Sequence, residues 1–198
     1  MYLSLRYVPD THSIFEGISK LAPGHMLSFD VNSGDIEIEN YWEAVSCLGE
    51  EVNESQMIEE VYELIQDSVK IRLMSDVPFG AFLSGGVDSS AVVATMSRLM
   101  DEPVKSFSIG FGEDPRLDER AFAENVASSC KTDHRNVNCT AAEVENLPRL
   151  LYHLDEPFSD PIIVPFHQVS RLAADHVKVV LTGEGADELF GGYTRYVS

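Results

Sequence analysis

One junction limits the folds open to this chain more than any other: an apolar run that breaks abruptly into a loop rich in glycine and serine. Residues 77–83 are typical of a buried strand, and residues 90–100 are typical of a helix. Glycines let a backbone approach a ligand closely, and the start of a helix presents N–H groups to an anion. The loop between the two elements has the sequence Ser84-Gly85-Gly86-Val87-Asp88-Ser89-Ser90. Because Asp88 would repel a bare phosphate, the loop indicates a polyphosphate that shares a divalent cation with the protein.

A Walker-type phosphate loop is an alternative that the sequence excludes. That loop needs a lysine that reaches the terminal phosphates, and no lysine occurs between Lys70 and Lys105. The segment LSGGVDSS instead resembles the pyrophosphate-binding loop of the ATP pyrophosphatases, enzymes that adenylate a substrate and release pyrophosphate. On this segment alone, a purely structural turn between a strand and a helix stays open.

A second segment repeats the combination of a short apolar strand and a polar, glycine-rich loop. Residues 177–182 are predicted to form the strand. Four glycines and three carboxylates follow within twelve residues, in the sequence Thr182-Gly183-Glu184-Gly185-Ala186-Asp187-Glu188-Leu189-Phe190-Gly191-Gly192-Tyr193. Such a composition packs poorly but suits the edge of a metal–phosphate site.

Together these two segments resemble the synthetase domain of the glutamine-hydrolysing asparagine synthetase family. Two segments between them are also similar to that family: FSIGF at residues 107–111 and LDEPFSDP at residues 154–161. The resemblance implies an α/β fold, a doubly wound parallel sheet of the ATP-pyrophosphatase (adenine nucleotide alpha hydrolase-like) type. It also implies that residues 1–48 are the tail of an amino-terminal glutamine amidotransferase domain and that residues 52–198 begin the synthetase domain.

The resemblance further implies that the chain is part of a longer enzyme. The family's glutaminase uses a cysteine at its mature amino terminus, whereas Tyr2 follows Met1 here. A lysine that the family needs for adenylation lies beyond the second motif, outside this chain. We therefore expect the chain alone to show neither glutaminase nor synthetase turnover. Because the tail would lack the domain on which it packs, we expect exposed apolar side chains at Tyr7, Ile14, Phe15, Ile18 and Trp42.

The region after residue 52 alternates between strands and helices, which is typical of a parallel sheet covered on both faces. A long helix with one apolar face is predicted to begin near Ser55. The predicted strands are residues 77–83, 104–110, 134–138 and 177–182, and the other predicted helices are residues 90–100, 117–129, 141–153 and 165–175, with Pro148 disturbing the third. A strand order of 3-2-1-4 would place the first and fourth strands side by side. Asp88 and Asp187 would then face one crevice at the carboxyl ends of the strands.

The site roles follow from side-chain chemistry and from the resemblance. Asp88 and Asp187 are the predicted magnesium ligands, because hard carboxylate oxygens can share that cation with phosphate oxygens. By the resemblance, Glu184 is the catalytic residue in adenylate formation, acting through the ligand network or as a proton acceptor. The residues expected to bind ATP are Leu83, Ser84, Gly85, Gly86, Asp88, Ser89, Ser90, Ile109, Thr182 and Gly183.

The amino-acid substrate is harder to locate in the sequence. The resemblance places it near four polar residues, Asp155, Glu156, Ser159 and Asp160. A solvated acidic loop held by Pro157 and Pro161 is an equal alternative for this segment. His134, near the third predicted strand, is interpreted as a packed or surface residue rather than a catalyst.

The resemblance implies an ATP-dependent amide ligase that converts aspartate to asparagine through β-aspartyl-AMP, with ammonia supplied by glutamine hydrolysis. Two alternatives stay open. The first is a related amidotransferase that acts on another carboxylate, and the second is an inactive nucleotide-binding fragment. The ATP half-site would look alike in enzymes that activate aspartate and in enzymes that activate another carboxylate, so the sequence leaves the substrate open.

Composition narrows the class of partner. The net charge of −19 argues against nucleic acid, whose phosphates require a basic surface. No apolar stretch approaches the roughly 20 residues that span a bilayer, and the amino terminus lacks an export signal. We therefore expect a cytoplasmic protein with small-molecule substrates and no membrane partner. The resemblance adds a homodimer as the expected assembly of the full-length enzyme.

Overall fold

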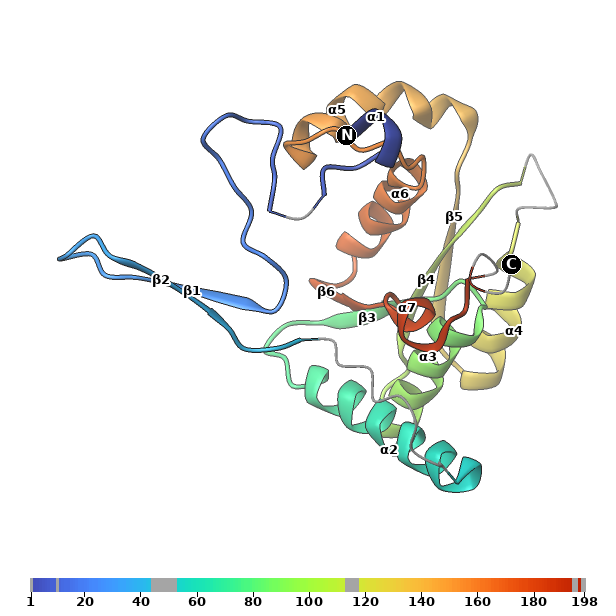
Figure 1. Cartoon of the computed structure of the whole chain (residues 1–198). Coiled ribbons are helices and arrows are strands. Elements are labelled where there is room, and N and C mark those ends of the chain that lie inside the picture. Colours follow the sequence, from blue (N-terminus) through green and yellow to red (C-terminus); the bar gives the residue numbers. More distant parts are fainter. Residues whose placement is uncertain (1, 10, 44–52, 113–117, 194–195, 197–198) are drawn as a thin grey trace. The chain divides into compact units, whose positions relative to one another are not determined.

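The computed structural model describes residues 2–9, 11–43, 53–112, 118–193 and 196 (Figure 1). The chain divides into two compact units. One unit combines Met1–Val52 with Leu147–Pro161, and the other combines Asn53–Asn146 with Ile162–Ser198. The predicted boundary between residues 48 and 52 lies outside the described residues, so the domain division stays a prediction.

The larger unit contains a sheet of four parallel strands. The strands are β3 (Phe79–Phe82), β4 (Lys105–Gly110), β5 (Asp133–Asn138) and β6 (Val179–Leu181). Their spatial order is β5-β4-β3-β6. In order of occurrence along this unit that is 3-2-1-4, so the predicted topology is confirmed. β3 is therefore a central strand, flanked by β4 on one side and by β6 on the other.

The first helix of this unit is α2 (Glu54–Arg72). Its amino-terminal cap is Asn53, whose side-chain oxygen accepts a hydrogen bond from the Gln56 amide at 3.3 Å. The helix thus begins one residue before the predicted start at Ser55, because asparagine supplies the acceptor that an orphan first-turn amide needs. Of its apolar face, Val69 is buried whereas Leu64 is 63% exposed. The carboxyl-terminal half of the helix therefore provides the packing.

The remaining helices of the unit are α3 (Val87–Leu99), α4 (Arg120–Cys130), α6 (Ile163–Ala174) and the short α7 (Ala186–Phe190). The sequence predicted the first three, with residue 117 of the second lying outside the described residues, and missed α7. None of the described helices is long and apolar enough to cross a membrane.

The helix predicted over residues 141–153 is wrong as a single element. The structure has a 3-10 helix, η1 (Ala141–Asn146), followed by the helix α5 (Leu147–Leu154). Pro148 occupies the first turn of α5, where its missing N–H leaves no hydrogen bond unmade. A continuous helix would have needed that N–H, so the chain starts a new helix instead.

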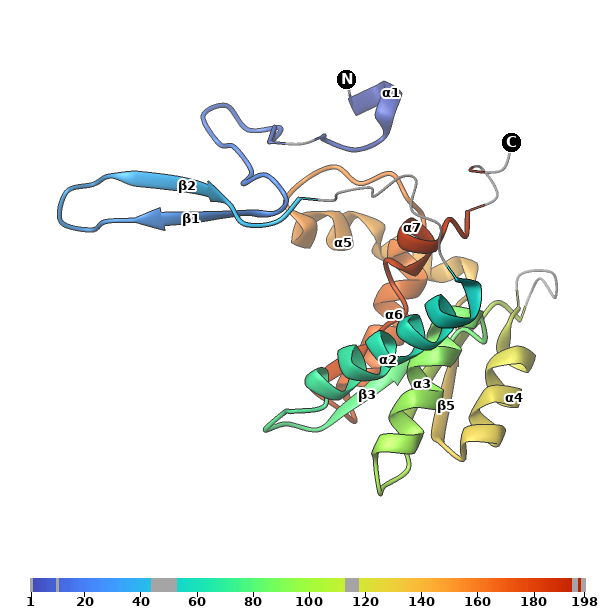
Figure 2. The same ribbon diagram turned by 60° about the horizontal axis from the view of Figure 1, so that its bottom comes forward.

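Two hydrophobic cores lie on opposite faces of the sheet. The helices α2, α3 and α4 cover one face and α6 covers the other (Figure 2). The first core includes Ala81 of β3 and Leu83, which directly follows β3, together with Val93 and Met96 of α3. The second core centres on Phe107 of β4, which packs against α6. Because successive residues of a strand face opposite sides, Phe107 points to one core while its neighbours Ser106 and Ser108 point to the other face. The fold is a doubly wound α/β fold.

The smaller unit contains α1 (Tyr2–Leu5), the antiparallel hairpin of β1 (His25–Phe29) and β2 (Ile36–Asn40), and α5. The Asp30 carboxylate begins the hairpin turn by accepting hydrogen bonds from the amides of Asn32 and Ser33 at 2.7 and 3.0 Å. The five residues predicted to be exposed in the amino-terminal segment are 49% to 60% exposed, which confirms that prediction: Tyr7, Ile14, Phe15, Ile18 and Trp42.

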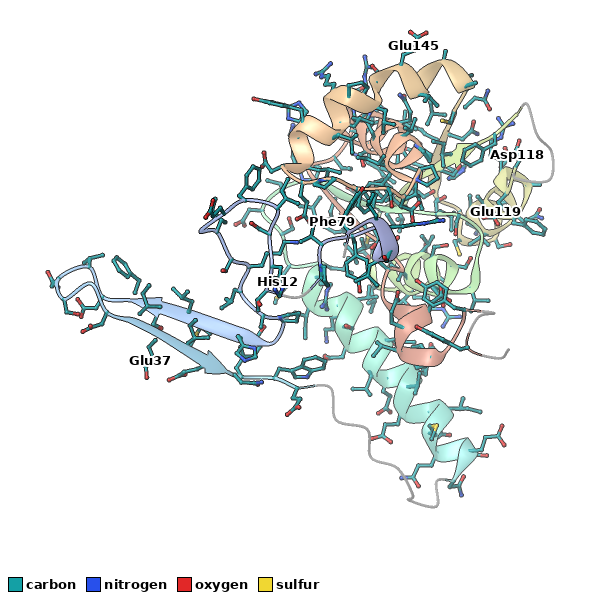
Figure 3. All side chains as sticks on the ribbon, turned by 45° about the horizontal axis from the view of Figure 1, so that its top comes forward. His12, Glu37, Phe79, Asp118, Glu119 and Glu145 are labelled. Carbon is teal, nitrogen blue, oxygen red and sulfur yellow. The ribbon has the colours of Figure 1, made fainter. Side chains whose placement is uncertain are left out.

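One face of the hairpin is apolar and exposed. Leu27 is paired with Ile38 and Phe29 with Ile36, so the four side chains share one face. Each of the four is exposed by 46% or more. The opposite face carries polar groups, among them Glu37 on β2 (Figure 3). The sequence reasoning had not identified this hairpin.

Candidate functional site

A cleft of about 310 Å³ opens in the larger unit, lined by the carboxyl ends of β3 and β4, by the segments that follow β3, β4 and β6, and by residues of α6. The chain leaves β3 toward β4 on one side, while β6 lies on the other, so this is a point where the strand order reverses. Open parallel sheets bind ligands at such points. The described residues that line the cleft are Phe82, Leu83, Ser84, Gly86, Asp88, Ser89, Phe107, Ser108, Ile109, Phe111, Glu119, Phe166, Val169, Thr182, Gly183, Glu184, Gly185, Asp187, Glu188 and Tyr193.

Serine hydroxyls form hydrogen bonds within the first glycine-rich motif, residues 84–90. Ser89 Oγ lies 2.9 Å from Ser84 Oγ and accepts a hydrogen bond from the Ser84 amide at 3.2 Å. Ser84 Oγ also accepts from the Gly86 amide at 3.2 Å. These contacts hold the loop in a tight curve directly after β3. Two serines are therefore occupied in shaping the loop, in addition to lining the cleft.

Helix α3 presents its amino terminus to this loop. The amides of the first turn of an α-helix have no intrahelical acceptor, and the cap residue here, Gly86, supplies none from a side chain. Gly85 has a φ of +88°, and a Cβ there would lie 2.5 Å from the Cβ of Phe122. Only glycine satisfies both conditions, so the sequence needs glycine at this position. The resulting loop exposes backbone N–H groups, which suit an anion.

The second motif packs directly on the first. A Cβ on Gly183 would lie 2.8 Å from the Ser89 amide nitrogen and 2.9 Å from the Asp88 Cβ. Glu184 is exposed and lines the cleft, with its amide 3.4 Å from the Thr182 hydroxyl. The loop after β6 therefore reaches the start of α3, and the carboxylates of both motifs border one cleft.

The cleft gathers most of the residues that the sequence singled out for ATP, metal and catalysis. Two of them do not line it: Gly85, which packs against α4, and Ser90, whose hydroxyl is buried without a hydrogen-bond partner among the described residues. The individual roles stay predictions. The predicted residues that line the cleft are Leu83, Ser84, Gly86, Asp88, Ser89, Ile109, Thr182, Gly183, Glu184 and Asp187.

The charge of the cleft is strongly one-sided. Five carboxylates line it, and none of the lining residues that the structure describes is a lysine, arginine or histidine. The five are Asp88, Glu119, Glu184, Asp187 and Glu188. Across the described part of the chain, no group of three or more histidine, cysteine, aspartate or glutamate side chains is arranged to hold a metal ion. A cation at Asp88 and Asp187 would therefore need further ligands, such as phosphate oxygens.

Sequence reasoning missed several lining residues. Phe166 of α6 makes an edge-to-face contact with Phe82 of β3, with ring centroids 5.5 Å apart. Glu119 lies just before α4, beside Asp118 (Figure 3). Ser108 lies within the FSIGF segment, of which only the neighbouring Ile109 was predicted to belong to the site. No sequence signal identifies Phe166 or Glu119, because their proximity depends on how α4 and α6 pack on the sheet.

The residues predicted to contact the amino-acid substrate belong to the smaller unit. Glu156 forms an ion pair with Lys20 at 2.8 Å, and the Ser159 hydroxyl donates a hydrogen bond to the Arg6 carbonyl at 2.9 Å. None of the four, Asp155, Glu156, Ser159 and Asp160, is among the described residues that line the cleft. Their substrate role stays a prediction.

His134 on β5 is held by hydroxyl groups on both ring nitrogens. Nδ1 lies 2.8 Å from Ser106 Oγ, and Nε2 lies 3.1 Å from Ser108 Oγ. Burial lowers the pKa of His134 below its ordinary value of 6.5, while the charge of Glu124 acts in the opposite direction. The ring is therefore neutral at physiological pH. The interpretation of His134 as a packed residue agrees with these contacts.

Comparison with known proteins gives related sequences over nearly the whole chain. Asparagine synthetase [glutamine-hydrolyzing] 1 of Bacillus subtilis is 36% identical over 196 residues, which cover 98% of this chain and 30% of that protein. Putative asparagine synthetase [glutamine-hydrolyzing] 2 of Methanocaldococcus jannaschii is 38% identical over 200 residues, which cover 100% of this chain and 38% of that protein. The chain thus spans about a third of the length of these curated relatives.

More distant similarities were also found. The amidase chyE of Penicillium rubens is 30% identical over 210 residues, which cover 94% of this chain and 30% of that protein. Among solved structures, the NH3-dependent NAD synthetase from Campylobacter jejuni aligns with a TM-score of 0.43 at 16% identity, covering 72% of this chain and 61% of that chain.

The family assignment rests on a family model described as Asparagine synthase, which matches residues 60–198. The matched region contains both glycine-rich motifs and all the described residues that line the cleft. This chain belongs to the asparagine synthase family.

Proposed function

We propose that this chain is the ATP-binding part of a longer glutamine-dependent asparagine synthetase. In the proposed reaction the side-chain carboxylate of aspartate attacks the α-phosphorus of ATP, which forms β-aspartyl-AMP and releases pyrophosphate. Ammonia from glutamine hydrolysis, carried out by another domain, then displaces AMP and yields asparagine. Adenylation is needed because a free carboxylate is a poor electrophile, whereas the mixed anhydride carries a good leaving group.

The observation that carries the proposal is the meeting of the two motifs at one cleft. Gly183 of the second motif packs against Ser89 of the first, and Asp88 and Glu184 line the same cleft. The uncapped start of α3 supplies backbone donors for phosphate oxygens. The tight approach that Gly85 and Gly183 permit fits a polyphosphate that contacts the backbone.

The charge of the cleft supports magnesium as the partner of ATP. Five carboxylates line the cleft, and the triphosphate of ATP is itself an anion, so direct contact between them would be repulsive. A divalent cation that bridges a carboxylate and phosphate oxygens converts this repulsion into attraction. In the proposed site Asp88 and Asp187 hold Mg²⁺, which supplies charge neutralisation at the phosphates when bound.

The remaining roles are proposed as follows. The serine and glycine groups of the first motif orient the pyrophosphate half of ATP. Glu184, which is exposed at the cleft, acts in adenylate formation rather than in holding the nucleotide. The backbone near Leu83, Ile109, Thr182 and Gly183 borders the adenosine. The homodimer, the cytoplasmic location and the substrate contacts of residues 155–160 rest on the family resemblance.

Isothermal titration calorimetry with the purified chain tests the nucleotide site. With Mg²⁺ present, Asp88→Asn is expected to weaken ATP binding about tenfold or more, because a charge-assisted ligand is lost. Without Mg²⁺ the same variant is expected to bind ATP no more weakly than the wild type, since one repulsive carboxylate is gone. Asp67→Asn, on the exposed surface of α2, is the matched control. Equal ATP affinity with and without Mg²⁺ would contradict the metal role.

A related amidotransferase that acts on another carboxylate is the second candidate. It is favoured by one observation, the 30% identity to a protein named amidase chyE rather than asparagine synthetase. The full-length protein should be assayed for carboxylate-dependent exchange of labelled pyrophosphate into ATP. Exchange with aspartate, and none with glutamate, malonate or larger acids, is the expected result. Exchange with another acid alone would identify a related amidotransferase, and no exchange with any acid would favour a nucleotide-binding role.

A further inference from the structure

A series of hydrogen bonds leads from Thr132, the residue before β5, to the cleft. The Thr132 hydroxyl lies 2.7 Å from Ser106 Oγ, which lies 2.8 Å from Nδ1 of His134. The other ring nitrogen of His134, Nε2, lies 3.1 Å from Ser108 Oγ. Ser106 is 0% and Ser108 3% exposed, and Ser108 lines the cleft. The parallel register pairs Ser106 with His134 and so fixes this alignment.

The donors in this series of hydrogen bonds can point in only two directions, because each hydroxyl has one proton and a neutral imidazole has one N–H. In one direction Nδ1 carries the proton and donates to Ser106, so the Ser108 hydroxyl must donate to Nε2. In the other direction Ser106 donates to Nδ1, and Nε2–H donates to Ser108. The Ser108 proton is then available to an acceptor in the cleft. The tautomer of His134 therefore decides whether Ser108 offers the cleft a donor or only lone pairs.

The distances favour the second direction. An O–H donor gives shorter contacts, near 2.7–2.8 Å, than an N–H donor, near 2.9–3.0 Å. The Ser106–Nδ1 distance of 2.8 Å fits a hydroxyl donor, whereas the Nε2–Ser108 distance of 3.1 Å fits an N–H donor. The Thr132–Ser106 contact of 2.7 Å joins two hydroxyls and is the same in both directions. Burial lowers the pKa of His134, and this effect exceeds the opposite effect of the Glu124 charge on α4. The ring is therefore neutral and carries a single N–H, as both directions require.

We infer that His134 is a positioning residue that makes Ser108 a hydrogen-bond donor to an acceptor atom of the nucleotide in the cleft. The chain of donors runs from Thr132 through Ser106 and His134 to Ser108, and each proton points toward the cleft. This inference rests on the proposed function for the identity of the ligand. It adds a side chain of β4 to the site, in addition to the loops that follow the strands.

The tautomer is measured in the absence of nucleotide. The chain is labelled with ¹⁵N at its six histidines, and long-range ¹⁵N–¹H correlation spectra separate protonated from unprotonated ring nitrogens. His134→Gln identifies the signals of His134 by their loss. The expected result is a neutral ring with the proton on Nε2. A proton on Nδ1 would overturn the inference whether or not the chain binds ATP.

ATP affinity tests the role of Ser108. Ser108→Ala is expected to weaken binding about three- to tenfold, which corresponds to one hydrogen bond, while Ser128→Ala on the exposed surface of α4 leaves it unchanged. His134→Gln, whose amide can donate to Ser108, is expected to stay within about twofold of the wild type, and His134→Leu to resemble Ser108→Ala. Repeating the titrations with AMP and adenosine shows whether the acceptor is a phosphate oxygen or part of the nucleoside.

Two failures are distinguishable in these titrations. A wild-type chain that binds no ATP contradicts the proposed function, together with the ligand named here. A wild-type chain that binds ATP with an affinity that Ser108→Ala leaves unchanged overturns the role of Ser108 alone. Because His134→Leu can disturb the sheet, its folding is checked by circular dichroism. The Ser108→Ala titration and the tautomer measurement decide the inference if that variant does not fold.

Discussion

Gly183 lies so close to the start of α3 that a Cβ atom on it would be 2.8 Å from the amide nitrogen of Ser89. The two residues belong to the two separate glycine-rich motifs of the sequence. β3 and β6 are neighbours in the sheet, paired from Phe79 with Val179 to Ala81 with Leu181. The loops that follow these strands therefore meet, and this contact makes one cleft from two distant segments.

Gly183→Ala is expected to destabilise the chain and to weaken ATP binding. The added methyl group would clash with the Ser89 amide nitrogen and the Asp88 Cβ. Overpacking of this kind costs about 1–3 kcal/mol. Because the clash pushes the second motif away from α3, ATP affinity should fall as well. Urea unfolding and calorimetric titration measure the two effects. Unchanged values in both would show that the two motifs can separate without loss.

Glu184→Gln in the full-length protein is expected to leave ATP binding within about threefold while largely abolishing aspartate-dependent pyrophosphate exchange. The physical reason is that the exposed Glu184 lines the cleft, and its negative charge adds nothing to the attraction for a nucleotide. Glu59→Gln on the exposed surface of α2 is the matched control. Normal exchange by the Glu184 variant would refute the catalytic role.

The stability of the chain is expected to depend on pH through His134. Its pKa is lowered by burial below the ordinary 6.5, so in the window below 6.5 the unfolded state binds a proton that the folded state does not. The contribution is fully present above pH 6.5 and is lost as the pH falls through the folded pKa. The free-energy advantage of wild type over His134→Gln should therefore be smaller at about pH 5 than at about pH 7.5. Urea unfolding at both values measures it, and an advantage that grows on acidification would contradict the prediction.

The purified 198-residue chain is expected to make no asparagine from ATP, Mg²⁺, aspartate and ammonia, whether or not it releases pyrophosphate. An adenylate in an open cleft would be hydrolysed by water rather than captured by ammonia. Chromatographic assay of both products, with a full-length relative as the positive control, measures this. Sustained turnover would show that the cleft described here is sufficient for synthesis.

The exposed apolar face of the hairpin should make the isolated chain prone to self-association. Leu27, Phe29, Ile36 and Ile38 form that face, and each is exposed by 46% or more. Replacing Ile36 and Ile38 by threonine keeps the β-branched shape that strands favour and removes apolar surface. Analytical ultracentrifugation should then show less association, whereas Glu37→Gln on the opposite face is the control. Equal association of the wild type, the double threonine variant and Glu37→Gln would show that another surface mediates self-association.

Much of the α/β unit could be predicted from local patterns. The strands β3 and β6 follow from short apolar runs, and the order of the four strands follows from the need to bring the Asp88 and Asp187 motifs together. The role of the glycines in both motifs could be predicted, because the close backbone approach they permit depends only on their lack of a side chain. The division of the predicted helix at Pro148 was not foreseen in full, since a proline can disturb a helix or begin one.

The residues that the sequence did not reveal are those whose roles depend on register and helix packing. Ser108 and His134 come together because β4 and β5 pair in parallel with Ser106 opposite His134. Phe166 joins the cleft because α6 packs on the face of the sheet that carries Phe82. A shift of one residue in pairing would send these side chains to the other face.

Backbone chemistry and strand periodicity are local, so the order of residues alone specified the phosphate-type loop, the strands and the acidic second motif. Contacts between side chains on different strands and helices are not local. They depend on a three-dimensional packing in which many side chains are buried at once, and no spacing along the chain encodes a single such contact. The hydrogen bonds around His134 and the contact between Phe82 and Phe166 at the cleft therefore exist only in the folded protein.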